Sequence, residues 1–155
     1  MKFAPVIYLI GMLLCILSLF MLVPAIVDWF YGSNDWPAFI ASSLVTVFFG
    51  GAFYLSGRGS ATEHLELRQA FLLTNSAWLS IALFGSLPFL FSEINMSFVD
   101  AIFESTSGIT TTGSTVIVNL EQTSHGILIW RALLQWLGGV GIIVMALAVL
   151  PMLSI

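Results

Sequence analysis

Charged side chains are scarce in this sequence. Of its 155 residues only 8% are charged, four being Lys or Arg and eight being Asp or Glu. A soluble domain has about 25% charged residues, so this chain cannot cover a water-exposed surface with polar groups. Four scattered basic residues form no patch for a phosphate backbone, which excludes nucleic acid as a partner.

Cysteine and catalytic motifs are equally rare. Cys15 is the single cysteine, so no disulfide framework can hold the chain together. The sequence contains neither the phosphate-binding pattern G-x-x-x-x-G-K-[ST] nor the nucleophile pattern G-x-S-x-G. His64 and His125 share no ligand spacing with Cys15 or with each other, which argues against a transition-metal site. The sequence therefore predicts that the protein is not an enzyme.

Long apolar runs are what the sequence has instead. Hydrophobic residues make up 59% of the chain, and the mean hydropathy is +1.04. About 20 apolar residues cross the hydrocarbon core of a bilayer as a helix. Four such spans are predicted, at about residues 3–27, 37–57, 69–91 and 126–150. We therefore expect an all-α integral membrane protein surrounded by lipid.

Polar residues mark the ends of these spans. Residues 28–36 form an expected loop that carries Asp28 and Asp35, and Pro151 closes the last span. Trp29, Trp36 and Trp130 fall near the outer ends of the spans, as in an aromatic belt at the membrane surface.

The few basic residues predict the orientation of the chain. Lys2, Arg58 and Arg68 fall on one side of the membrane if the first two spans form a hairpin. Basic residues favour the cytoplasmic side. The N terminus and a hinge at residues 58–68 are thus expected in the cytoplasm, with the protein in the cytoplasmic (inner) membrane.

The segment between the third and fourth spans is not an ordinary polar loop. An apolar stretch follows Ser97, and eight of the eleven residues from Ser105 to Thr115 carry hydroxyls. Ser97 can cap a helix over about residues 98–108, and Gly108 is a suitable C-terminal stop. Such a helix is about 16 Å long, so it can enter the membrane but cannot cross it.

The run after Gly108 is then expected to return to the outer surface as an extended ribbon. Irregular backbone at membrane depth is tolerated only if protein buries it or if it lines a water-filled path. A ring of backbone carbonyls on such a path replaces the hydration shell of a cation. Gly113 suits this role because glycine reaches the dihedral angles that aim successive carbonyls in one direction. The alternative is a Ser/Thr-rich external loop of no special function.

Two sequence motifs resemble a known family. Residues 103–115 (FESTSGITTTGST) are similar to the first pore loop of the Trk/Ktr/HKT potassium transporters, closest to the bacterial TrkH type. Residues 130–143 (WRALLQWLGGVGII) are similar to the helix that follows it. The resemblance covers most of the chain: two leading helices at residues 1–68, then one helix–pore loop–helix repeat at residues 69–155.

The resemblance implies a potassium ion as the bound species. Thr111, Thr112, Gly113 and Ser114 match the strand whose backbone oxygens form the selectivity filter, with Thr110 at its inner edge. Relatives with Ser in place of Gly113 tend to pass sodium, so Gly here favours potassium.

Thr115 stands where a potassium channel has its second filter glycine. In this family that is usual, and it implies a shorter filter that holds fewer ions than the filter of a potassium channel.

The resemblance also implies partners. In that family four repeats in one chain surround one pore, and this chain holds one repeat, a quarter of a filter. We expect an N-terminal fragment, a truncated gene product or one piece of a split assembly, completed by the remaining pore repeats. A homodimer of the complete protein and a cytoplasmic nucleotide-binding regulatory subunit are implied as well. The competing interpretation is a noncatalytic membrane scaffold or assembly subunit with a vestigial pore loop.

Two charges near the pore loop require partners. An ionised side chain at membrane depth costs about 2.5–3.5 kcal/mol on insertion scales. We predict that Glu104 and Arg131 form an ion pair that braces the loop against the last span; the alternative is that Arg131 reaches the outer headgroups. Asp100 lies nearer the outside, either as a solvated residue or as one that concentrates cations.

Three glycines occupy the last span. Gly138, Gly139 and Gly141 are expected to let helices approach closely, with a gating hinge as the alternative.

Overall fold

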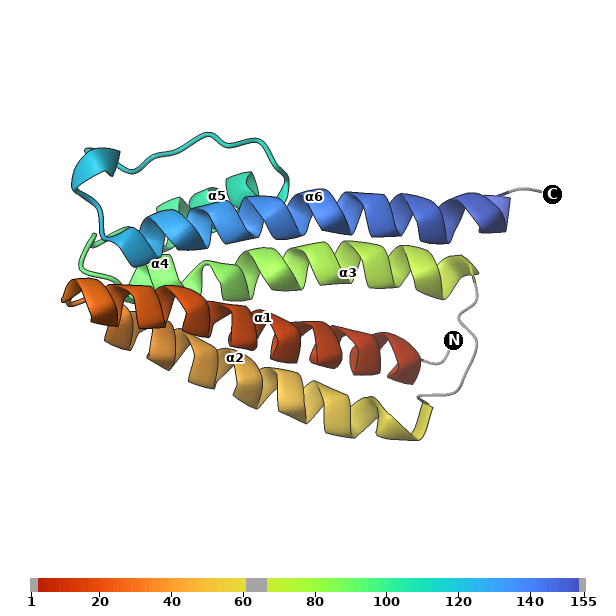
Figure 1. Cartoon of the computed structure of the whole chain (residues 1–155). Coiled ribbons are helices and arrows are strands. Elements are labelled where there is room, and N and C mark those ends of the chain that lie inside the picture. The colour runs from red at the N-terminus through yellow and green to blue at the C-terminus, as the bar shows by residue number, and fades with distance from the viewer. Residues whose placement is uncertain (1–2, 61–66, 154–155) are drawn as a thin grey trace.

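The computed structural model describes residues 3–60 and 67–153, and these residues form helices joined by short loops. The elements, in chain order, are α1 (Ala4–Tyr31), α2 (Trp36–Gly57), the 3-10 turn η1 (Arg58–Ser60), α3 (Leu67–Gly85), α4 (Leu87–Phe91), α5 (Phe98–Ile109), the 3-10 turn η2 (Leu120–Gln122) and α6 (His125–Leu153). Four long helices lie side by side, and both chain ends lie at the same end of the bundle (Figure 1).

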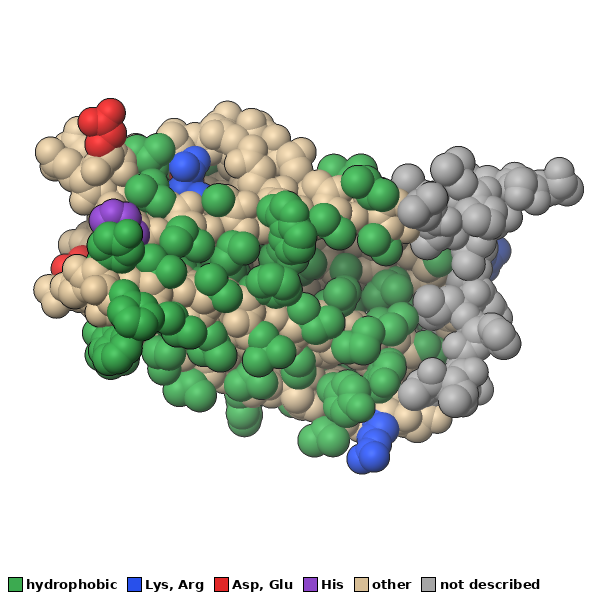
Figure 2. Space-filling view, in the orientation of Figure 1, with side chains coloured by type: hydrophobic (Ala, Val, Ile, Leu, Met, Phe, Trp, Pro, Cys, Tyr) green, Lys and Arg blue, Asp and Glu red, His purple; other side chains and the backbone are tan. Residues whose placement is uncertain are grey.

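Among the described residues, four helical segments are long and apolar enough to cross a membrane. They cover Ala4–Tyr31, Trp36–Gly57, Arg68–Phe91 and His125–Met145. Hydrophobic side chains cover most of the length of the bundle on the face shown in Figure 2, and acidic side chains gather at one end. The all-α membrane architecture expected from the sequence is therefore confirmed.

The hairpin of α1 and α2 is held by very close helix contact. A Cβ added at Gly11 would lie 2.3 Å from the Tyr54 backbone nitrogen, so α2 leaves no room for one. A Cβ added at Gly57 would lie 2.6 Å from the carbonyl oxygen of Ala4. Ser43 Oγ also donates to the carbonyl of Ser18, 2.9 Å away. Small residues at the contact let the two backbones meet, as is common between helices in membranes.

The first helix runs further than the sequence predicted. α1 continues to Tyr31, so Asp28 lies in its last turn and is fully buried, whereas we expected it in a polar loop. The carboxylate of Asp28 accepts a hydrogen bond from the backbone nitrogen of Gly126, 2.6 Å away at the start of α6. A helix N-terminus has amide hydrogens without intrahelical partners, and Asp28 satisfies one of them.

The third span is not one continuous helix. α3 ends at Gly85, and after a turn at Ser86 the short helix α4 begins, with Pro88 as its second residue. Proline has no N–H to continue the helical ladder, which accounts for a break that hydropathy alone does not reveal. At the other end of the chain, α6 runs through Pro151 to Leu153, so that proline does not end the helix as expected.

Trp130 is a second residue whose environment differs from the prediction. Its side chain is fully buried, and its Nε1 donates to the carbonyl of Gly85, 2.9 Å away. Trp29 and Trp36 are exposed, as an interfacial position requires, but Trp130 instead packs with Phe39 and ties α6 to the break after α3. A buried indole contributes an apolar ring for packing, and its N–H donates one specific hydrogen bond. Trp130 therefore fixes α6 against the end of α3 in both ways.

The expected cytoplasmic hinge lies only partly in the described residues. Arg58 belongs to η1 and Arg68 to the first turn of α3, whereas Lys2 and residues 61–66 lie outside the part of the chain that the structure describes.

Candidate functional site

The short helix α5 begins where the sequence predicts. Ser97 is its N-cap, and Ser97 Oγ accepts from the backbone nitrogen of Asp100, 3.1 Å away. The same hydroxyl donates to Asp100 Oδ2 at 2.7 Å. The acidic side chain of Asp100 is thus held in the first turn, where the helix dipole favours negative charge.

The end of α5 differs slightly from the prediction. The helix includes Gly108 and ends at Ile109, with Thr110 as its C-cap. Gly108 therefore does not stop the helix; a Cβ there would lie 3.0 Å from the Cβ of Leu134, so this glycine lets α5 approach α6. Gly138 has a similar role, since its added Cβ would lie 1.9 Å from the carbonyl oxygen of Ile109.

These contacts fix the depth of the site. Gly138 is the thirteenth residue after the start of α6 at His125, which places it about 20 Å along the helix. The end of α5 rests there, well within the 21-residue membrane-capable part of α6. Figure 1 shows α5 running beside α6 and the loop after it returning toward the end where α5 began. Helix α5 with its loop therefore forms a re-entrant unit.

Of the three glycines in the last span, Gly138 clearly serves packing. No heavy atom lies within 4 Å of a Cβ added at Gly139, and one added at Gly141 would meet only the ring of Trp78, 3.9 Å away. The packing interpretation thus holds for Gly138 and does not extend to Gly139.

The chain turns sharply after α5. Thr111 has φ +60° and Gly113 has φ +79°, both in the left-handed region. The carbonyl of Ser107 accepts two backbone N–H groups, from Thr112 at 3.0 Å and from Gly113 at 3.2 Å. Two amides are thus directed back at the helix, as in the caps that close helix C-termini. Gly113 fits the expectation that glycine permits an unusual backbone angle here.

The backbone carbonyls of Thr111, Thr112 and Gly113 accept no hydrogen bond from any residue that the structure describes. All three residues are exposed on the surface of this chain. Buried backbone carbonyls are nearly always paired with protein or water. Backbone of this kind is tolerated at membrane depth only where further protein buries it or where it lines a water-filled path.

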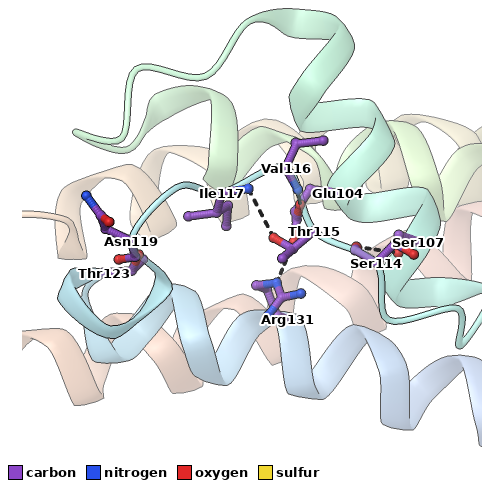
Figure 3. A network of polar contacts seen from close by, with 9 residues as sticks. All are labelled: Glu104, Ser107, Ser114, Thr115, Val116, Ile117, Asn119, Thr123 and Arg131. Atoms are coloured by element: carbon purple, nitrogen blue, oxygen red, sulfur yellow. Dashed lines mark hydrogen bonds and ion pairs between the residues drawn. The ribbon is translucent and has the colours of Figure 1, made fainter.

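Ser114 differs from its three neighbours. Its carbonyl accepts a hydrogen bond from Ser107 Oγ, 2.6 Å away, so this oxygen lies against α5 (Figure 3). Of the four residues whose backbone oxygens the sequence assigns to the filter, three have free carbonyls and Ser114 does not.

Hydroxyl groups at the inner end of the ribbon bond to one another. Thr110 Oγ1 donates to the carbonyl of Thr106, 2.7 Å away. It lies 2.9 Å from Thr112 Oγ1, and because its single hydrogen is already used it accepts from that hydroxyl. These threonine hydroxyls thus stabilise the turn that follows α5 through hydrogen bonds.

The carboxylate of Glu104 joins the ribbon to α6. One oxygen, Oε2, accepts from the backbone nitrogen of Val116, 3.1 Å away, and the other accepts from Arg131 Nε. Glu104 is buried, and the side chain of Arg131 is 20% exposed. Both oxygens of a buried charge are therefore satisfied, one by the backbone and one by an ion pair. Arg131 points to Glu104 and not to the headgroups.

Sequence reasoning missed two residues of this site. Ser107 was one of eight hydroxyl residues in a run, and nothing in the run distinguishes it. Gln135, in α6, lies behind the ribbon, its Nε2 3.2 Å from the position of a Cβ on Gly113. Ser105 does not belong to the site: it is fully buried against Gly85 of α3, and its hydroxyl has no hydrogen-bond partner among the described residues.

Comparison with known proteins identifies the family. The family model for TrkH, described as a cation transport protein, matches residues 35–155. The chain belongs to the TrkH family. That family is one of transport proteins and not of enzymes.

Relatives match along the whole chain. The chain is 42% identical to the Trk system potassium uptake protein TrkH of Vibrio parahaemolyticus, covering all of this chain and 32% of that protein. It is 38% identical to the protein of the same name from Escherichia coli, with the same coverage. The crystal structure of the potassium transporter TrkH from Vibrio parahaemolyticus superposes with a TM-score of 0.93 at 41% identity, over all of this chain and 33% of that one. The chain thus spans about a third of the length of these relatives.

Proposed function

We propose that this chain supplies one quarter of the selectivity filter of a potassium uptake transporter in the cytoplasmic membrane. The observation that carries the proposal is that three of the four residues assigned to the filter, Thr111, Thr112 and Gly113, have free carbonyls where a helix ends partway along a membrane-capable helix. Carbonyl dipoles in such a run replace the water around a cation as it passes. The names of the relatives support potassium as that cation.

Three further repeats complete the pore in this proposal. Residues 69–155 form one helix–pore loop–helix repeat, and the exposed side of the ribbon at 110–116 faces the other three. The leading helices at residues 1–68 lie outside the pore and hold α3 and α6. The N terminus is cytoplasmic. The complete protein forms a homodimer and associates with a cytoplasmic nucleotide-binding regulatory subunit.

Glu104 and Arg131 support the filter without touching the ion. Their ion pair joins α5, the ribbon and α6 through the Val116 nitrogen. The pair therefore fixes the distance between the ribbon and the helix behind it. It leaves the three free carbonyls as the groups that meet the ion.

Replacing Gly113 by Asp in the complete transporter tests the proposed function. A side chain at φ +79° strains the backbone, and a carboxylate beside the carbonyls binds the cation too tightly to release it. We expect potassium uptake by cells to be abolished while the amount of protein in the membrane stays unchanged. Wild-type uptake in this variant would contradict the filter assignment and favour the scaffold interpretation.

A further inference from the structure

From Thr112 to Val116, the backbone groups of the ribbon that are hydrogen-bonded among the described residues are held by two residues of α5. Glu104 and Ser107 are three residues apart, which places both on one side of the helix. Between them they bond to four backbone groups of the ribbon: the nitrogens of Thr112, Gly113 and Val116, and the carbonyl of Ser114. Three of these groups are donors that would point away from a cation in any case. The Ser114 carbonyl is the exception, because it is a potential ion ligand that is turned toward the helix.

The Ser107 hydroxyl is the group that turns it. This side chain is 6% exposed, and its Oγ lies 2.6 Å from the Ser114 oxygen. The hydroxyl has one hydrogen, and this bond uses it. Further along the ribbon, the Val116 nitrogen is held by Glu104, 3.1 Å away, so the backbone is secured on both sides of the Ser114 carbonyl.

We propose that Ser107 is a positioning residue that sets the outer limit of ion coordination in this quarter of the filter. Its hydroxyl withdraws the Ser114 carbonyl from the ion path, so that of the four residues assigned to the filter only Thr111, Thr112 and Gly113 have carbonyls free for coordination. This inference rests on the proposed function, and it revises the expectation that Ser114 is an ion ligand. Selectivity depends on the number of carbonyl dipoles around the ion as well as on their spacing. Ser107 therefore acts on ion discrimination through Ser114, without touching the ion.

The variant Ser107→Ala in the complete transporter isolates this contact. Alanine lacks the hydroxyl but keeps the backbone carbonyl that accepts from Thr112 and Gly113, so the rest of the turn retains its hydrogen bonds. The released Ser114 carbonyl can then turn toward the ion. One neutral hydrogen bond is worth about 1 kcal/mol, so we expect the ratio of potassium to sodium uptake to change about three- to tenfold.

A matched control lies two residues away. Ser105 is on the same helix, is fully buried, and has a hydroxyl with no partner among the described residues. Ser105→Ala makes the same chemical change without releasing a carbonyl, and it should leave the uptake ratio unchanged. Ser107→Thr retains a hydroxyl at the key position and should keep the wild-type ratio. Ser107→Cys has only a weak donor and should give an intermediate ratio.

The results distinguish the inference from the function beneath it. A wild-type potassium-to-sodium ratio in Ser107→Ala, with uptake abolished in Gly113→Asp, overturns the role of Ser107 and leaves the filter intact. Wild-type uptake in Gly113→Asp overturns the filter itself. If Ser107→Ala does not reach the membrane, Ser107→Thr and Ser107→Cys decide: equal ratios in these two variants contradict the proposal, and a changed ratio in the Cys variant alone supports it.

Discussion

The leading hairpin and the pore unit are both made of helices that touch closely, but they are held in different ways. In the hairpin of α1 and α2, backbone meets backbone across glycines such as Gly11, and the partners are joined by a short loop. In the pore unit the decisive contacts are polar, such as Glu104 with Arg131, 27 residues apart. Close packing of the two helix backbones stabilises the hairpin, whereas a small number of hydrogen bonds stabilises the ribbon.

The difference follows from what each region must expose. The hairpin consists of two long helices whose interior backbone groups bond along their own helix, so lipid can surround it. The ribbon at 110–116 must leave some carbonyls free, and it therefore cannot be stabilised by a ladder of its own. Four of its other backbone groups, between Thr112 and Val116, are held by Ser107 and Glu104 on α5. A filter needs this arrangement because a carbonyl that is already paired is less available to an ion.

Removing one charge of the buried ion pair should have the largest effect on stability. In Arg131→Met, the buried carboxylate of Glu104 loses its counter-ion, which costs about 3–5 kcal/mol of unfolding free energy. Adding Glu104→Gln removes the unpaired charge while the amide oxygen still accepts from Val116. We expect the double variant to be more stable than Arg131→Met in thermal unfolding of the purified complete protein. A loss below about 1 kcal/mol in Arg131→Met would indicate a solvated arginine at the headgroups.

Enlarging a glycine in each region should have an intermediate effect and should separate the two regions. A Cβ at Gly138 meets the Ile109 carbonyl at 1.9 Å, and one at Gly11 meets the Tyr54 nitrogen at 2.3 Å. Overpacking of this kind costs about 1–3 kcal/mol. We expect both Gly→Ala variants to lower the unfolding temperature, but only Gly138→Ala, which displaces the pore helix, to change the potassium-to-sodium uptake ratio.

Two neighbouring glycines provide the controls for this comparison. Among the described residues, no heavy atom outside the neighbouring turns of its own helix lies within 4 Å of an added Cβ at Gly139 or at Gly51. Alanine is the better helix former by about 1 kcal/mol, so these variants should be as stable as the wild type or slightly more so. A changed uptake ratio in Gly11→Ala would show that the hairpin also determines the filter geometry, against the distinction drawn here.

A hydrogen bond between the two regions should have the smallest effect. Asp28 in α1 accepts from the backbone nitrogen of Gly126, 98 residues away. Loss of a capping acceptor costs about 0.5–2 kcal/mol, so Asp28→Ala should lower the unfolding temperature modestly. Asp28→Asn keeps an acceptor oxygen, so its unfolding temperature should lie between those of Asp28→Ala and the wild type. An unfolding temperature in Asp28→Ala equal to that of the wild type would show that the leading helices do not stabilise α6 through this bond.

The sequence predicts some elements well because their signals are local. Ser97 with the apolar residues after it predicts α5 to within one residue, and the membrane spans follow from hydropathy. The ion pair of Glu104 with Arg131 was also expected, since two charges at membrane depth need partners. Such features depend on a short stretch of chain or on the cost of an unpaired charge.

The features that the sequence does not predict depend on three-dimensional context. The break at Ser86 is an exception, because hydropathy does not reveal it but Pro88 marks it locally. Asp28, in contrast, is buried only because α6 begins beside it. Ser107 is one hydroxyl residue among eight between Ser105 and Thr115, and only the turn at Thr111 decides which hydroxyl meets the ribbon.

The position of a bound ion tests the account most directly. Rubidium scatters anomalously and substitutes for potassium, so crystals of the complete transporter grown in rubidium chloride would show where the cation rests. The account predicts an anomalous peak within coordination distance of the carbonyls of Thr111, Thr112 and Gly113. Rubidium bound elsewhere in the protein, with none beside these carbonyls, would contradict it.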